Sequence, residues 1–148
     1  TLETRIMDVC TRIDDAISLA ALVVSTLRAL YRLRMKNQRW RDYSSMLIRE
    51  NRWRAMRYSF DEGLIDFGKG SIVPFEELLD EFIEISIEDA KKLGCDKEVM
   101  ATKNILKRGT SAHRQLKTYE LSIAKGKNKN EALNDVVDML INETAADL

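Results

Sequence analysis

The chain has 148 residues, which is enough for one domain with a sizeable core, and 45% of them are hydrophobic and 32% charged, as in soluble globular proteins. The formal net charge is zero and no zinc-finger or RNP pattern occurs, so the composition excludes a typical nucleic-acid-binding domain. The longest apolar stretch, residues 16–33, is interrupted by Ser, Thr and Arg, and Cys10 and Cys95 have no metal-ligand or redox spacing. We therefore expect no membrane span and a reducing, cytoplasmic compartment.

The neutral total conceals an uneven distribution of charge. Residues 1–58 hold eleven Arg and one Lys against six acids, whereas residues 59–148 hold two Arg and ten Lys against eighteen acids. A surface that only keeps the protein soluble would mix Lys with Arg throughout. The excess of arginine in residues 1–58 therefore indicates a functional set, because arginine forms bidentate hydrogen bonds that lysine cannot.

Residues 1–9 alternate apolar and polar side chains, with Glu3 and Arg5 on one face, which is the period of a half-buried strand. A lone strand is not stable, and the rest of the chain offers no sheet partner apart from one short hairpin. We therefore expect its neighbours to come from outside this chain.

A long helix is predicted over residues 13–35, with Arg28, Arg32 and Arg34 near its C-terminal end. Its apolar residues cover much of the circumference, which predicts burial on more than one side. These residues are Ile13, Ala16, Ile17, Ala20, Val23, Val24, Leu27, Leu30 and Tyr31.

A second helix, from Ser44 or Ser45 to Tyr58, carries the strongest concentration of arginine. Helical spacing places Arg49, Trp53 and Arg57 on one face. Asn51 and Arg54 lie on the neighbouring face. One interpretation is structural, a cation–π ladder along the Trp ring. The other is functional, with Asn51, Arg54 and Arg57 lining a pocket for a phosphate or carboxylate.

The remainder of the chain predicts a hairpin over residues 58–67 that turns at 61–63, followed by helices. The expected helices are 74–85, with Pro74 at its first position, then 86–93, 96–107, one from Thr110 or Ser111, and one from about Asn130. The acids of helix 74–85 are interpreted as a solvated face rather than a metal site. His113, the single histidine, could be an exposed helix-start residue, a core histidine or a general base.

Three separated blocks carry a family resemblance: TLETRIMDVC at 1–10, RENRWRAMRY at 49–58 and GTSAHRQL at 109–116. Together they resemble the ATP-dependent carboxylate–amine ligases related to type 2 glutamate–cysteine ligase. The resemblance covers essentially the whole chain but only the C-terminal part of a family member. Two positions depart from the family: Ser59 stands where Gly is usual, and His113 where an acid is usual.

The resemblance implies an α+β fold, in which residues 1–148 form a single, mainly helical C-terminal region of a glutamine-synthetase-like ligase. We expect about five or six helices, one N-terminal strand and one short hairpin, with the N-terminal sheet absent from this chain. The family phosphorylates a carboxylate with ATP and magnesium, and an amine then displaces the phosphate.

Carried onto this sequence, the resemblance makes Glu3 a magnesium ligand and Arg5 a catalytic contact to the transferred phosphoryl group. Asn51, Arg54 and Arg57 match positions of the substrate or phosphate pocket. For Glu3 and Arg5 the alternative is an ion pair on a wet sheet face.

The predicted function is that of an ATP-dependent carboxylate–amine ligase acting on small-molecule substrates. This chain would supply its last catalytic strand and helical part, the remaining N-terminal part being a necessary partner, and a homo-oligomer is left open. We expect the isolated chain to be inactive. The alternative is a non-enzymatic helical module whose arginine-rich face binds an acidic partner.

Overall fold

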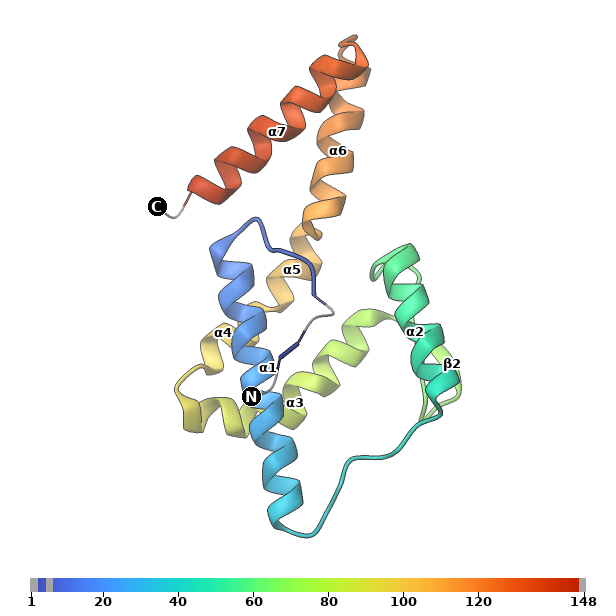
Figure 1. Ribbon diagram of the computed structural model, residues 1–148, viewed down its shortest axis with the longest axis vertical. Helices are drawn as coiled ribbons and strands as arrows, with labels where there is room; N and C mark the ends of the chain where they lie inside the picture. Colours follow the sequence, from blue (N-terminus) through green and yellow to red (C-terminus); the bar gives the residue numbers. More distant parts are fainter. Residues whose placement is uncertain (1–2, 5–6, 147–148) are drawn as a thin grey trace.

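The computed structural model describes residues 3–4 and 7–146, and within them it confirms a mainly helical fold with one short hairpin. Figure 1 shows three parts: a central helical layer, α2 with the hairpin on one side, and α6 with α7 projecting from one end. The elements are α1 (Ile13–Met35), α2 (Ser45–Tyr58), β1 (Leu64–Asp66), β2 (Ser71–Val73), α3 (Phe75–Leu93), α4 (Asp96–Ala101), α5 (Lys103–Arg108), α6 (Ser111–Ala124) and α7 (Lys129–Ala145).

The central layer is formed by α1, α3 and α4, which share one small hydrophobic core. Its buried members are Ala21, Leu79, Ile83, Ala90 and Val99. The core is smaller than the length of the chain predicts, because two of these five side chains are alanine.

A buried carboxylate fastens α1 to α3. Asp89 of α3 is almost wholly buried and lies 3.4 Å from Arg28 and 3.0 Å from Arg32, both on α1. A buried carboxylate is tolerated only when it is paired, so these two arginines fix the register between the helices.

α1 is buried on one side only, which corrects the expectation of burial on several sides. Its buried residues are Asp15, Ser18, Ala21, Ser25 and Ala29, all small or short. By length and composition alone α1 could cross a membrane, despite the interrupting polar residues, although core helices and signal sequences pass the same test. Several large apolar residues of α1 are exposed within the described structure, among them Ile17, Val24 and Tyr31.

The expected strand over residues 1–9 is not found where the chain is described. Residues 3–4 and 7–10 have no strand pairing, and positions 1, 2, 5 and 6 lie outside the described residues. A strand is stable only beside another strand, and among the described residues β1 and β2 pair with each other and not with this segment.

The hairpin lies further along the chain than the sequence predicts. Leu64 pairs with Val73 and Asp66 with Ser71, so the turn falls at 67–70 instead of 61–63. Asp66 Oδ1 accepts hydrogen bonds from the backbone N–H groups of Gly68 and Lys69, at 2.7 and 3.1 Å, and these bonds hold the pKa of Asp66 below its usual value.

The sequence places the hairpin turn at Gly63, but this glycine is needed for a different reason. It has φ 65° and precedes β1, and a Cβ there would lie 2.2 Å from the Val73 carbonyl oxygen. Close approach of two backbones therefore explains this glycine better than a hairpin turn does.

Two helix boundaries also differ from expectation. α3 is one continuous helix, with Pro74 as its N-cap, and buried Ser86 donates its hydroxyl to the Phe82 carbonyl at 2.8 Å. The helix expected over 96–107 is interrupted at buried Thr102, whose hydroxyl donates to the Val99 carbonyl at 2.6 Å.

Ser59 ends α2 in a backbone conformation that favours glycine. Its φ is 55° and its ψ −121°, the angles of the first central position of a type II′ turn. The Asp61 N–H donates to the Tyr58 carbonyl at 3.0 Å and closes that turn. The usual family glycine at this position is therefore explained by backbone geometry, and serine is strained there.

Replacing Ser59 with glycine should raise the free energy of unfolding by about 1 kcal/mol, because glycine adopts a positive φ without the Cβ clash. Urea unfolding followed by circular dichroism measures the change. The control is Ala55→Gly at an exposed position inside α2, which should lower the free energy of unfolding by about 1 kcal/mol. A destabilised Ser59→Gly variant would contradict the turn.

Candidate functional site

Two polar side chains of α2 hold the hairpin by its backbone. The Asn51 amide donates to the Ile65 carbonyl at 2.9 Å and accepts the Ile65 N–H at 2.8 Å. Arg54 donates to the carbonyls of Gly63 at 3.2 Å and Glu62 at 2.8 Å. The face that helical spacing assigned to Asn51 and Arg54 therefore exists, and it is turned toward residues 62–65.

The cation–π interpretation needs a different ring from the one expected. The guanidinium carbons of Arg54 and Arg57 lie 5.9 and 5.8 Å from the centre of the Tyr58 ring. Trp53 meets the same ring edge-on, with centroids 5.6 Å apart. Arg57 is exposed and makes no ion pair with any described residue, so its guanidinium is held in place but keeps its donors available.

Phe60 joins the α2–hairpin part to the rest of the molecule. Its ring stacks on His113 at the start of α6, with centroids 4.7 Å apart and planes at 19°. It also lies 6.3 Å from Phe75, the first residue of α3. One aromatic side chain therefore contacts two helices that begin 36 residues apart.

Both ring nitrogens of His113 are engaged in hydrogen bonds. Nδ1 lies 3.1 Å from the Thr110 backbone nitrogen, which can only donate, so Nδ1 accepts. In neutral His113 the ring proton then resides on Nε2, 3.2 Å from an Asp61 carboxylate oxygen that accepts it. Thr110 is the expected N-cap of α6, and His113 completes its capping box.

The departure from the family at position 113 therefore has a structural explanation. An acid at the third helical position would accept the same Thr110 N–H, and His113 performs that role through Nδ1. These contacts favour a helix-start role for His113 over that of a general base, because neither nitrogen is left to take a substrate proton.

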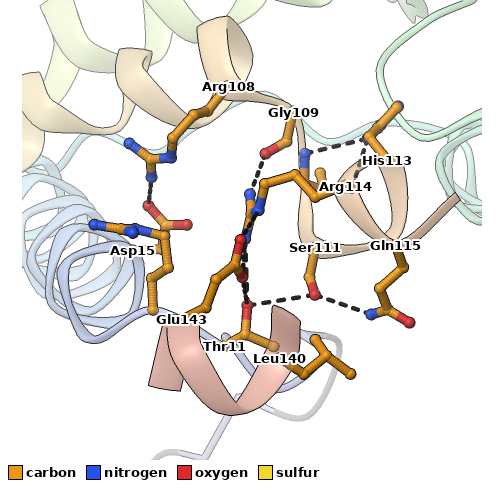
Figure 2. Close-up of polar contacts among 12 residues, drawn as sticks. Thr11, Asp15, Arg108, Gly109, Ser111, His113, Arg114, Gln115, Leu140 and Glu143 are labelled. Carbon is orange, nitrogen blue, oxygen red and sulfur yellow. Dashed lines mark hydrogen bonds and ion pairs between the residues drawn. The ribbon is translucent and has the colours of Figure 1, made fainter. Parts of the chain in front are cut away.

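A buried polar network unites three distant segments (Figure 2). Arg114 of α6 pairs with Glu143 of α7, with Nε to Oε1 at 2.5 Å and side chains 15% and 14% exposed. The Thr11 hydroxyl donates to Glu143 Oε2 at 2.7 Å. Arg114 also donates to the Gly109 carbonyl at 2.5 Å.

Further contacts surround this network. Gln115 donates to Ser111 Oγ at 3.0 Å, and Asp15 of α1 pairs with Arg108 at the end of α5. The hydrogen bonds from Arg114 hold the pKa of the Glu143 carboxyl below its usual value, against the opposing effect of burial. The beginning of α1, the α5–α6 junction and the end of α7 are thereby tied together.

An open cavity of about 520 Å³ lies beside Phe60, between the hairpin and the start of α3. Its lining combines the carboxylates of Asp61, Glu62 and Glu76 with the apolar side chains of Phe75 and Leu106. The cavity is adjacent to the backbone that Arg54 holds.

The other predicted site residues are placed as follows. Glu3 is exposed in the extended segment before α1, and Arg5 lies outside the described residues. In the part of the chain that the structure describes, no group of three His, Cys, Asp or Glu side chains is arranged to hold a metal ion. Among the described residues, Glu3 is therefore not part of a three-donor group of the kind that holds a magnesium ion.

Comparison with known proteins supports the family resemblance that the three blocks carry. The family model described as glutamate-cysteine ligase family 2 matches residues 1–139. The chain belongs to glutamate-cysteine ligase family 2. The family is one of glutamine-synthetase-like, ATP-using ligases, as the resemblance of the three blocks implied. No solved structure matches the chain significantly.

Relatives in this family are longer than the chain. It is 55% identical over all 148 residues to a protein of Rhodospirillum rubrum, and covers 38% of that protein. Identities to proteins of Jannaschia sp. and Paracoccus denitrificans are 48% and 45%, again over the whole chain and 39% of each relative. All three are provisionally named glutamate–cysteine ligase 2. The chain thus spans about two fifths of these ligases.

Sequence reasoning missed the residues that join the family's blocks. Thr11 directly follows the first block and Arg114 belongs to the third, yet neither is predicted from the sequence as a site residue, and Glu143 lies just before the segment expected to fray. The sequence did contain one signal, the arginine in GTSAHRQL. Arginine is a residue type that forms buried ion pairs, and this one stands near the first turn of a helix, where a cation is unfavourable without an acidic partner.

The Arg114–Glu143 pair predicts a specific pH dependence. Because the folded pKa of Glu143 is lowered, its contribution to stability is present above the usual glutamate pKa and is lost as pH falls through the folded value. Glu143→Gln should therefore reduce the free energy of unfolding by about 2 kcal/mol at pH 7. The difference from the unmodified chain should shrink toward pH 3.

Urea unfolding between pH 3 and 7 measures this difference. The matched control is Glu120→Gln, because Glu120 is exposed on α6 and makes no hydrogen bond or ion pair through its side chain among the described residues. A difference for Glu143→Gln that does not change with pH would contradict the role of the carboxylate charge.

Proposed function

We propose that the chain is the part of an ATP-dependent carboxylate–amine ligase, of the glutamate–cysteine type, that carries its last catalytic segment and helical region. The observation that carries the proposal is that residues shortly after the first two blocks contact the third block: Thr11 contacts Ser111, and Asp61 contacts His113. Thr11 also contacts Glu143 of α7. Family membership over residues 1–139 and the relatives' names support the same chemistry.

The proposed reaction has two steps. A carboxylate oxygen of glutamate attacks the terminal phosphorus of ATP, so that a P–O bond forms and the bond to ADP breaks. The amine nitrogen of the second substrate then attacks the acyl carbon. Phosphate leaves with the C–O bonding electrons, and the nitrogen loses a proton to give the amide.

Within this reaction we assign charge neutralisation to Arg5 and magnesium binding to Glu3, as the resemblance implies. Arginine stabilises negative charge that builds on a transferring phosphoryl group, and this stabilisation needs no proton transfer. Bound magnesium would supply charge neutralisation of the ATP phosphates. Further ligands would come from the part of the ligase that this chain does not cover.

Among the three predicted pocket residues, the contacts suggest two kinds of role. Arg57 presents an exposed guanidinium beside Tyr58 and is suited to bind a phosphate or carboxylate directly. Asn51 and Arg54 bind the backbone of residues 62–65 and would position the wall of the cavity next to Phe60. ATP and a thiol-bearing amine substrate would both be available in a reducing cytoplasm.

The direct test is a chimera in which this chain replaces the matching 148 residues of the Rhodospirillum rubrum relative. ATP-dependent formation of the glutamate–cysteine amide and ADP should be measured for the chimera and for the chain alone. We expect activity from the chimera and none from the chain, because the proposal takes the further magnesium ligands from the part of the ligase that this chain does not cover. Glu3→Ala and Arg5→Ala should each lower kcat about 100-fold in the chimera.

The control is Arg52→Ala, on the exposed face of α2, which should leave kcat and KM unchanged. Circular dichroism must show that every variant is folded. Turnover by the chain alone would disprove the need for the remaining part. A folded chimera that makes no amide, beside an active parent, would overturn the assignment of function.

A further inference from the structure

The exposed and buried faces of α1 differ from those of a usual amphipathic helix. The fully buried residues of α1, from Asp15 to Ala29, are small or short, whereas many of its large apolar residues are exposed. Leu22 is an exception that packs against the core. The exposed fractions are 50% for Ile17, 47% for Val24 and 64% for Tyr31. Large aliphatic side chains normally occupy the buried side of an amphipathic helix, so this face needs a cover.

The exposed residues form one continuous stripe. Ile17, Ala20, Val24, Leu27 and Tyr31 follow one another at alternating intervals of three and four residues, which keeps them on the same side of the helix. At 1.5 Å per residue the stripe is about 21 Å long. Contiguous apolar surface of this kind marks an interaction site.

The extended segment before α1 lies along part of the stripe. A groove of about 410 Å³ lies between this segment and α1. It is lined by Thr4, Met7, Asp8 and Cys10 from the segment and by Ala16, Leu19, Ala20, Val23, Val24 and Leu27 from the helix. The segment that holds Glu3 therefore shares a groove with the apolar face. Burial in this groove raises the pKa of the Cys10 thiol.

Three occupants could cover the stripe: a lipid bilayer, a second copy of the chain, or the rest of the ligase. A bilayer is disfavoured because Arg28 and Arg32, which pair with Asp89 of α3, and buried Asp15 all lie on α1. The rest of the ligase is favoured because the chain accounts for only 37–39% of the length of five relatives, and the remainder must pack against some part of it.

We propose that the stripe Ile17–Ala20–Val24–Leu27–Tyr31 is the docking surface for the region of the ligase that this chain does not cover. The proposal rests on the proposed function, since it takes the chain to be part of a longer ligase. Docking there would cover the apolar face and the adjoining groove at once. It would also bring outside carboxylates toward the segment that contains Glu3.

The test compares thiol labelling in the 148-residue chain and in the complete chimera. Val24→Cys is introduced into both, and peptide mass spectrometry separates its reaction with a maleimide from that of Cys10 and Cys95. We expect at least about tenfold slower labelling in the chimera. Tyr31→Cys is the second variant if Val24→Cys fails to fold, and Met56→Cys, 71% exposed on α2, is the control that should label equally in both.

Each other occupant gives a distinct result. Equal labelling in the chain and the chimera overturns the proposal. The proposal is also overturned if the chain is dimeric by light scattering and Val24→Cys is already protected from labelling. The same holds if Val24→Cys is protected only when phosphatidylcholine–phosphatidylglycerol vesicles are added. Thiol labelling does not require catalytic turnover, so the two proposals are tested separately. An inactive chimera with a protected stripe would refute the ligase chemistry alone. An active chimera with a reactive stripe would refute the docking surface alone.

Discussion

The ion pair between Arg114 and Glu143 is the contact on which the arrangement of the site depends. It is largely withdrawn from water, and Thr11 donates to the same carboxylate from a position 132 residues earlier in the chain. A buried charge without its partner is strongly unfavourable, so the pair constrains where α6, α7 and the start of α1 can lie. The segment that carries Glu3 ends at this network, which links the predicted catalytic residues to the C-terminal helices.

A second set of contacts holds the arginine-rich helix in relation to this network. Asn51 and Arg54 bind the backbone before and within β1, and Phe60 stacks on His113 at the start of α6. The α2–hairpin part has little hydrophobic core of its own, since α2 has no buried residue. Polar and aromatic contacts therefore position the surface that would meet substrate, while the core of α1, α3 and α4 supplies the support.

The sequence predicted those features that depend on local chemistry. The ranges of α1 and α2, the N-cap at Thr110 and the shared face of Asn51 and Arg54 follow from spacing and capping, and the structure contains them. Features set by distant partners were not predictable: the Gly63 signal came from contact with Val73, and the partner of Arg114 lies 29 residues away. The strand over residues 1–9 was predicted from its alternation, but a strand forms only beside another strand. The docking surface proposed on α1 depends in the same way on a neighbour that this chain does not contain.

The claim that Glu143 holds the segment after the first family block against Arg114 of the third block is tested most directly by a double-mutant cycle between Thr11 and Glu143. The free energies of unfolding of Thr11→Val, Glu143→Ala and the double variant give the coupling between two residues that only the folded structure brings together. The account predicts a coupling energy of about 1 kcal/mol. A coupling near zero, with both single variants folded, would contradict it.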